Sequence, residues 1–276
     1  MNLLFVAYKP RFISSNKFLN TLKKKYNIKK MGFSGTLDPF AEGVLIIASN
    51  QYTKLFRFLQ KTPKVYEATL IFGAYSKSLD IKNIEYIKET KPFSKTEIED
   101  VLLSFKGKQS QLPPKYSAKK IDGKRSYKIK SDEIYLNKEI EVEIFDIELI
   151  DYSHPFLTFK ASVSEGTYIR SLAFDIAKKL NTTATLSYLK REKEGKFTYQ
   201  CEKQLNPIEY LNLTKNYYLN DINNLLLGKK LDIKDFEIKE NGEYVIEYDN
   251  YFSIIKIENQ EVKYILNKIK KGSLWK

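Results

Sequence analysis

The 276-residue chain contains a single cysteine, Cys201, and a single histidine, His154. One cysteine cannot form an internal disulfide, which is typical of proteins from a reducing cytoplasm. One histidine and one cysteine are too few for a zinc cluster, and the carboxylates show no EF-hand spacing. No apolar run is long enough to span a membrane, and the short apolar N-terminus lacks the features of a signal peptide. These absences predict a cytoplasmic protein with neither a His/Cys metal cluster nor a membrane anchor. A metal site made of carboxylates alone stays open on this ground, but no motif points to one, and we expect no metal.

Nucleotide-binding motifs are also missing, since the sequence contains neither a Walker loop nor a dinucleotide fingerprint. We therefore expect no cofactor. The composition, with 42% hydrophobic and 29% charged residues, is that of a globular protein. A chain of this length fits one large domain, or a main domain with a small appendage.

Acidic residues are scarce at the start of the chain and outnumbered throughout. The net charge is +13, which favours a polyanionic partner, although a lysine-rich composition alone can raise the charge. Between Lys106 and Lys130, nine basic residues accompany one acidic residue, with Tyr116 and Tyr127 among them. Lysines can bind phosphates while tyrosine rings stack on unpaired bases, so this segment predicts an exposed RNA-binding loop. Residues 80–100 mix both signs and are expected to form a solvated surface.

The first acidic residue of the chain, Asp38, follows eight basic ones. It lies in residues 31–45, where four glycines and prolines predict a shaped loop rather than a helix or strand. Nearby positive charge should lower the pKa of Asp38, keep it ionised and make it available as a nucleophile. Asp-Pro between glycines is also ordinary turn chemistry, and composition alone favours that interpretation.

The surrounding residues resemble the catalytic motif of the TruB-type tRNA pseudouridine-55 synthases. The matching stretch is Gly32-x-Ser34-Gly35-Thr36-Leu37-Asp38-Pro39-x-Ala41-x-Gly43-Val44-Leu45. Further similar blocks follow the family's order and cover roughly residues 1–195. They are Lys9-Pro10 with Ser14-Ser15-Asn16, Tyr66 with Gly73, Ser76 and Asp80, Pro114-x-Tyr116-Ser117-Ala118-x-Lys120, Gly166-Thr167-Tyr168-Ile169-Arg170, and Leu186-x-x-Leu189-Lys190-Arg191.

The resemblance implies that uridine is isomerised to pseudouridine in the T-loop of tRNA, on a nucleotide flipped out of its stack. Asp38 would be the nucleophile or base, acting at either the ribose or the uracil, and Arg170 would pair with it. The resemblance further implies that Tyr66 stacks on the base. Assistance by Tyr66 in the final deprotonation of the base is an open second role. Substrate-binding roles are implied for Lys9, Phe33, Tyr168, Leu189, Tyr116, Lys119 and Lys120. Phe33 is a departure, because many bacterial relatives have a histidine there.

The pattern of apolar residues predicts an α+β fold. Strands are expected at 3–8, 65–73, 140–151 and 156–163, and helices at 15–26, 94–107 and 164–180, with a helical pattern at 52–60. The resemblance implies a mixed, mostly antiparallel sheet with flanking helices and a central cleft. We expect a catalytic domain over 1–210, with an RNA-binding insertion at about 106–135. Short strands after residue 244 predict a small β-rich appendage over 211–276, and the resemblance implies that it is PUA-like and binds RNA.

Two alternatives belong to other classes of protein. One is a guide-dependent synthase of the dyskerin type, which needs partner proteins. The other is a non-catalytic RNA-folding protein in which Asp38 is vestigial. The Tyr116-Ser117-Ala118 block argues against the first, and the presence of Asp38, Tyr66 and Arg170 argues against the second. We therefore predict a monomeric enzyme that has tRNA as its partner and needs no obligate protein partner.

Overall fold

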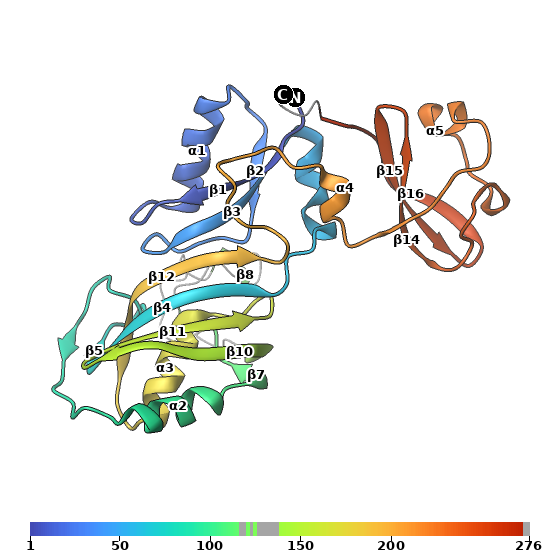
Figure 1. The fold of residues 1–276 in the computed structure, drawn as a ribbon. Coiled ribbons are helices and arrows are strands. Elements are labelled where there is room, and N and C mark those ends of the chain that lie inside the picture. The colour runs from blue at the N-terminus through green and yellow to red at the C-terminus, as the bar shows by residue number, and fades with distance from the viewer. Residues whose placement is uncertain (116–119, 122–123, 126–137, 273–276) are drawn as a thin grey trace.

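The computed structural model describes residues 1–115, 120–121, 124–125 and 138–272. Its centre is an eight-stranded sheet with the order β1-β3-β12-β4-β11-β10-β7, and β2 pairs with β3 (Figure 1). Neighbouring strands are antiparallel except β12 and β3, whose parallel pairing joins Lys190 to Glu42 and Arg191 to Gly43. The prediction of a mixed, mostly antiparallel sheet is therefore confirmed.

The elements of this part of the chain have the following bounds. The strands of the central sheet are β1 (Leu4–Lys9), β2 (Met31–Ser34), β3 (Glu42–Ser49), β4 (Lys64–Phe72), β7 (Gly107–Gln111), β10 (Ile140–Ser153), β11 (Phe156–Val163) and β12 (Ala184–Glu194). Two small pairs are β5 (Ala74–Tyr75) with β6 (Tyr86–Ile87) and β8 (Lys120–Ile121) with β9 (Lys124–Arg125). The helices are α1 (Ser15–Lys25), the 3₁₀ helix η1 (Asn50–Phe58), α2 (Lys95–Leu103) and α3 (Ile169–Lys179).

The central sheet has one dry and one wet face, as β4 illustrates. Tyr66, Ala68 and Leu70 are buried, whereas Glu67 and Thr69 between them are only partly buried. The buried face packs against α2 and α3, whose apolar stripes join the same core cluster (Figure 1). This alternation is the period of a strand with one face in the core. The helix α1 covers a separate cluster formed with β1, β2 and β3.

The segment around Asp38 contains more strand and less loop than its glycines and prolines predicted. Residues 31–34 and 42–49 are strands, so the prediction of a loop over the whole of 31–45 is wrong at both ends. Met31 at one end and Val44 and Leu45 at the other are buried in the sheet, and this burial outweighs the glycine pattern. Gly43 has φ +113° and passes close to β12, where a Cβ would lie 2.2 Å from the carbonyl oxygen of Arg191. Only residues 35–41 remain for the loop, which makes it short and firmly anchored.

Other elements differ in type or length from those that the sequence predicted. The helical pattern at 52–60 forms a 3₁₀ helix that begins at Asn50. The helix expected at 94–107 begins after its N-cap Ser94 but ends at Leu103, and Gly107 begins β7. The basic segment is therefore a strand at its start, because residues 107–111 pair with β10. The helix expected at 164–180 begins only at Ile169.

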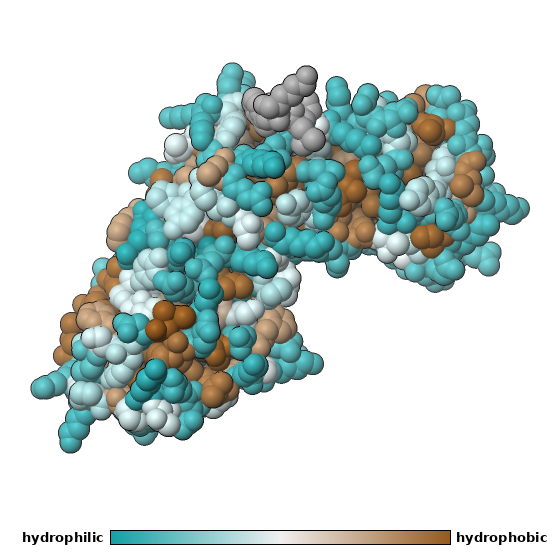
Figure 2. Space-filling view, in the orientation of Figure 1, coloured by the Kyte–Doolittle hydropathy of each residue, from teal (hydrophilic) through white to brown (hydrophobic). Residues whose placement is uncertain are grey.

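The C-terminal part forms a second sheet with the order β13-β14-β15-β16. Its elements are α4 (Pro207–Tyr210), β13 (Thr214–Lys215), α5 (Asn223–Leu227), the 3₁₀ helix η4 (Ile233–Asp235), β14 (Gly242–Tyr248), β15 (Tyr251–Glu258) and β16 (Glu261–Lys270). It lies at one end of an elongated molecule, with α2 and β7 at the other, and Gly272 lies beside Asn2 between them (Figure 1). Phe252 and Ile254 share a core cluster with Leu4 and Tyr52 of the first part. Hydrophilic residues cover most of the visible face of both parts (Figure 2).

Candidate active site

A cavity of about 300 Å³ opens between the Asp38 loop, β4, β12 and the start of α3. Five of the predicted site residues line it, namely Asp38, Tyr66, Tyr168, Arg170 and Leu189. The remaining lining residues are Gly35, Thr36, Leu37, Lys64, Glu165, Gly166, Thr167, Ile169 and Arg191. The structure therefore brings four distant sequence blocks to one place.

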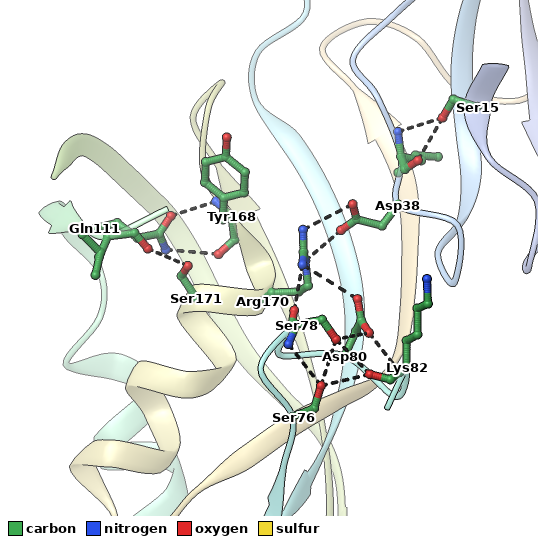
Figure 3. Close-up of polar contacts among 12 residues, drawn as sticks. Ser15, Asp38, Ser76, Ser78, Asp80, Lys82, Gln111, Tyr168, Arg170 and Ser171 are labelled. Carbon is green, nitrogen blue, oxygen red and sulfur yellow. Dashed lines mark hydrogen bonds and ion pairs between the residues drawn. The ribbon is translucent and has the colours of Figure 1, made fainter. Parts of the chain in front are cut away.

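Two side chains from the N-terminal block fix the Asp38 loop. The Ser15 hydroxyl contacts both backbone groups of Leu37, donating to its carbonyl at 2.9 Å and accepting from its N–H at 3.1 Å (Figure 3). The Lys9 ammonium donates to the carbonyls of Ala41 at 2.7 Å and Ile13 at 2.8 Å. Asp38 therefore sits on a backbone held on both sides, which is the preorganisation that a reacting group requires.

The Asp38 carboxylate and the Arg170 guanidinium form a two-pronged ion pair. Arg170 Nε lies 2.9 Å from Asp38 Oδ2, and Nη2 donates to Oδ1 at 3.3 Å (Figure 3). Such bidentate charge-assisted contacts fix both the position and the plane of a carboxylate. The Arg170 side chain is 4% exposed, whereas that of Asp38 is 33% exposed and faces the cavity. The guanidinium is therefore buried behind the carboxylate that it holds.

Asp80 is a further acidic residue of the site, and it was missed because residues 80–100 were expected to form a solvated surface. It is 7% exposed, and its Oδ2 lies 3.8 Å from Arg170 Nη1. The Ser78 hydroxyl and the Lys82 N–H both donate to its Oδ1, while Ser78 offers its carbonyl to Arg170 at 2.7 Å. Arg170 is thus shared by two carboxylates. The Ser76 and Asp80 positions of the family motif were the signal for this role.

The electrostatic setting of Asp38 differs from the sequence prediction. Burial in the cavity wall raises the pKa of the Asp38 carboxyl above its usual value, and the Asp80 charge acts in the same direction. Arg170 and Lys9 lower that pKa but do not outweigh burial. The expected lowering of this pKa is therefore wrong in direction. A raised pKa makes the ionised carboxylate a stronger base and nucleophile.

Gln111 links the basic segment to the helix that carries Arg170, and sequence reasoning missed it too. Its side chain is 3% exposed. The side-chain amide accepts from the N–H of Tyr168 at 2.8 Å and donates to the Tyr168 carbonyl at 3.1 Å (Figure 3). The Tyr168 N–H is otherwise an orphan donor at the start of α3, so Gln111 satisfies it. The Ser171 hydroxyl adds a bond to the carbonyl of Leu112.

The other predicted substrate-binding residues lie away from the cavity or outside the described ranges. Lys9 is 0% exposed and its ammonium is engaged by backbone carbonyls, which contradicts a direct contact with phosphate. Burial also lowers the pKa of Lys9 to about 8. Phe33 is half-buried in β2 and packs against the α1 cluster instead of lining the cavity. Tyr116 and Lys119 lie outside the residues that the structure describes, and for Lys120 only the backbone in β8 is described.

One carboxylate held by a buried guanidinium, in a cavity walled by tyrosine and leucine, suits covalent or acid–base chemistry on a flat, neutral group. Among the described residues, no three His, Cys, Asp or Glu side chains gather to hold a metal ion. Within the same ranges, no helix is both long and apolar enough to cross a bilayer. A carboxylate fixed by a buried guanidinium beside tyrosine and leucine side chains defines an enzyme-like cavity suited to a planar ring.

Comparisons with known proteins identify the family. A family model described as TruB family pseudouridylate synthase (N terminal domain) matches residues 23–169. The tRNA pseudouridine synthase B of Sulfurovum sp. is 54% identical, over 98% of each chain. That of Campylobacter jejuni serotype O:2 is 51% identical, over 98% of this chain and 100% of the other. The chain belongs to the TruB family of pseudouridylate synthases, as the motifs predicted.

Solved structures agree on the fold. A chain in the crystal structure of a Cbf5-Nop10-Gar1 complex superposes with a TM-score of 0.66 at 19% identity, covering 98% of this chain and 84% of that one. An H/ACA RNP bound to a substrate RNA containing 2'-deoxyuridine gives a TM-score of 0.65, also at 19% identity, with the same coverage. At this identity the likeness concerns the fold alone. It bears out the predicted pseudouridine-synthase-like architecture.

Proposed function

We propose that this protein isomerises uridine to pseudouridine at position 55 in the T-loop of tRNA, with Asp38 as the reacting carboxylate. The observation that carries the proposal is the bidentate Asp38–Arg170 pair. The Asp38 carboxylate is exposed to the cavity, and the Arg170 guanidinium is buried behind that carboxylate. Membership of the family and the full-length relatives named tRNA pseudouridine synthase B support the choice of reaction and substrate.

The reaction needs a held base and one carboxylate, with no change of oxidation state. The bond between N1 of uracil and C1′ of ribose breaks, the uracil turns within the cavity, and C5 bonds to C1′. C5 then loses a proton while N1 gains one, so the atoms balance without a co-reactant. Asp38 would attack either the ribose or the uracil ring and be released when the new bond is complete. Its raised pKa favours both attack and proton removal.

The cavity walls supply what the base requires. Tyr66 would stack on the uracil, and Leu189 and Tyr168 would limit its movement while it turns. A cavity of about 300 Å³ suits a single flipped nucleotide. Taking the uridine out of its stack costs on the order of a few kcal/mol, which contacts to the cavity and the RNA backbone must offset.

Binding of the tRNA would involve the basic segment at about 106–135, including Tyr116, Lys119 and Lys120. The 1–210 part would then act as the catalytic domain and the 211–276 part as an RNA-binding appendage. The net charge of +13 supports a polyanionic partner. We include in the proposal that the enzyme acts as a cytoplasmic monomer without a cofactor, a metal or an obligate protein partner.

The test is incubation of the purified protein with unmodified tRNA transcript, without added cofactor. Pseudouridine is mapped by chemical modification and primer extension. We expect one new pseudouridine, in the T-loop, which disappears with Asp38→Asn while RNA affinity changes by only a few-fold. Asp100→Asn, at an exposed position of α2, is the matched control and should retain activity.

Three other outcomes would contradict parts of the proposal. Salt-sensitive binding without product would favour a guide-dependent or purely RNA-binding protein. Product at another uridine would refute the T-loop assignment. Full activity of Asp38→Asn would refute the catalytic role of Asp38.

A further inference from the structure

A buried group of charged side chains lies at the wall of the cavity and has no role in the mechanism above. Glu194, at the end of β12, is 0% exposed. Its Oε2 lies 3.2 Å from Arg191 Nη2, and its Oε1 lies 3.3 Å from Lys64 Nζ. Neither oxygen accepts a hydrogen bond of good geometry from the described residues. An ionised carboxylate so placed persists only because two cations face it.

Arg191 connects this carboxylate to both ends of the Asp38 loop. Its Nη2 donates to the carbonyl of Gly35 at 2.8 Å, where the loop begins. Its Nε donates to the carbonyl of Val44 at 2.9 Å, in β3 just after the loop ends. One rigid, planar guanidinium therefore spans the base of the loop. Its side chain is 1% exposed, so it has no solvent to replace these partners.

Glu194 supplies the charge that keeps this guanidinium in place. Burial opposes the charge of Arg191, but the Glu194 carboxylate, together with Tyr66 and Glu165, more than offsets burial and raises the pKa of the guanidinium. The Tyr66 side chain is also a neighbour of Arg191. The arrangement thus touches the loop of Asp38 and the tyrosine expected to stack on the base.

Gly35 leaves no free space above the pair. A Cβ at this position would lie 2.8 Å from Glu194 Oε1 and 3.0 Å from Arg191 Nη1, and the residue has φ +66°. The backbone of the loop therefore rests directly on the Glu194–Arg191 pair. A shift of either side chain moves the start of the loop, three residues before Asp38.

We propose that Arg191 and Glu194 are positioning residues for catalysis, which clamp the two ends of the Asp38 loop at the wall of the cavity. This inference rests on the proposed function and extends it from the Asp38 carboxylate to the side chains that hold its backbone. Arg170 fixes the carboxylate from the side of α3, and Arg191 fixes the backbone that carries it. Misplacement of a reacting group by about 1 Å can cost about 100-fold in rate.

The test compares Glu194→Gln with Glu192→Gln, an identical change two residues away on the same strand. Glu192 pairs with Lys160 and Lys190 on the wet face of the sheet. Single-turnover rates and tRNA dissociation constants are measured at a temperature where circular dichroism shows both variants folded. We expect Glu194→Gln to be about 10- to 100-fold slower with its tRNA affinity retained, and Glu192→Gln to match the wild type. Amide exchange of residues 36–43 should accelerate in Glu194→Gln alone.

Arg191→Lys is the second variant, because it keeps the positive charge but cannot bridge two carbonyls. It should show the same loss of rate, and the double variant should be no slower than either single one. If Glu194→Gln does not fold, Arg191→Lys decides the question. A folded variant with a rate within about two-fold of Glu192→Gln, or with unchanged exchange in 36–43, overturns the inference. Absence of pseudouridine with the wild type refutes the proposed function instead, and the exchange measurement still tests the clamp.

Discussion

Asp38 is the residue at which opposing electrostatic effects meet. Burial and the Asp80 charge raise the pKa of its carboxyl, while Arg170 and Lys9 lower it. The balance leaves a carboxylate that is geometrically fixed yet more basic than a surface aspartate. Arg170 connects the two acidic groups, since it pairs with Asp38 and is itself held by Asp80 and the Ser78 carbonyl.

This balance predicts the pH dependence of the reaction. A free aspartate titrates near pH 4, so the single-turnover rate should begin to fall on the acid side at a higher pH than that. Asp80 raises the pKa of Asp38, because a second negative charge nearby disfavours ionisation. Asp80→Asn should therefore move the acid limb to lower pH, while slowing the reaction through the weaker hold on Arg170. The measurement is a pH–rate profile for both proteins.

The exposed Asp100→Asn variant serves as the control and should leave the acid limb in place. An acid limb that moves to higher pH in Asp80→Asn would contradict the inference that Asp80 raises the pKa of Asp38. An unchanged limb in that variant would show that Asp38 does not control it.

At the scale of single residues, sequence predicted the groups that touch the cavity better than those that support them. Asp38, Arg170 and Tyr66 could be found because motifs carry them. Asp80 and Gln111 act through contacts between segments far apart in the chain, and a local charge pattern placed Asp80 on the surface. The substrate-binding role of Lys9 was implied by the resemblance of the Lys9-Pro10 block. The burial of Lys9 depends on where β1 ends relative to the Asp38 loop, which no short stretch of sequence specifies.

At the scale of elements, strands with strong alternation were predicted well. The pair at 140–151 and 156–163 became β10 and β11 with nearly the expected bounds. The Asp38 segment was predicted less well, because glycines suggested a loop where tertiary pairing with β3 and β12 makes strands. Gly43 is needed there for the close approach of two backbones rather than for a turn.

The junction between the two sheets gives a prediction at this scale. Phe252 of β15 is fully buried in the cluster that also contains Leu4, Tyr52 and Leu55. Phe252→Ala should cost about 3–5 kcal/mol in the free energy of unfolding and loosen both parts. Phe236→Ala removes an equally buried ring from a cluster confined to the C-terminal part. Hydrogen exchange should then rise in β1 and β3 with Phe252→Ala, but not with Phe236→Ala.

The two variants also test whether the C-terminal sheet is an independent unit. Equal protection of β1 and β3 in both variants would mean that the shared cluster contributes little to the first part. The division at residue 211 would then be a full domain boundary. With the expected result, the catalytic part depends on the C-terminal sheet for a share of its core.

At the scale of the whole molecule, charge distinguishes the two faces of the central sheet. The wet face carries a row of alternating charges across four strands, in the order Glu148, Lys160, Glu67 and Lys190. Opposite charges side by side stabilise the sheet slightly and cancel at a distance. Glu67 follows Tyr66 in β4 and faces away from the cavity. The wet face therefore offers little net attraction for a polyanion.

This asymmetry predicts which lysines contribute to RNA affinity. Each phosphate contact that is lost should reduce the slope of log affinity against log salt by about 0.7–0.9. The double variant Lys119→Ala/Lys120→Ala, in the basic segment, should weaken tRNA binding and lower the slope by about 1.5. Lys160→Ala/Lys190→Ala removes the same charge from the wet face and should leave the slope unchanged. The measurement is tRNA binding over a salt series, and equal slopes for the two double variants would mean that net charge alone, rather than its distribution, attracts the RNA.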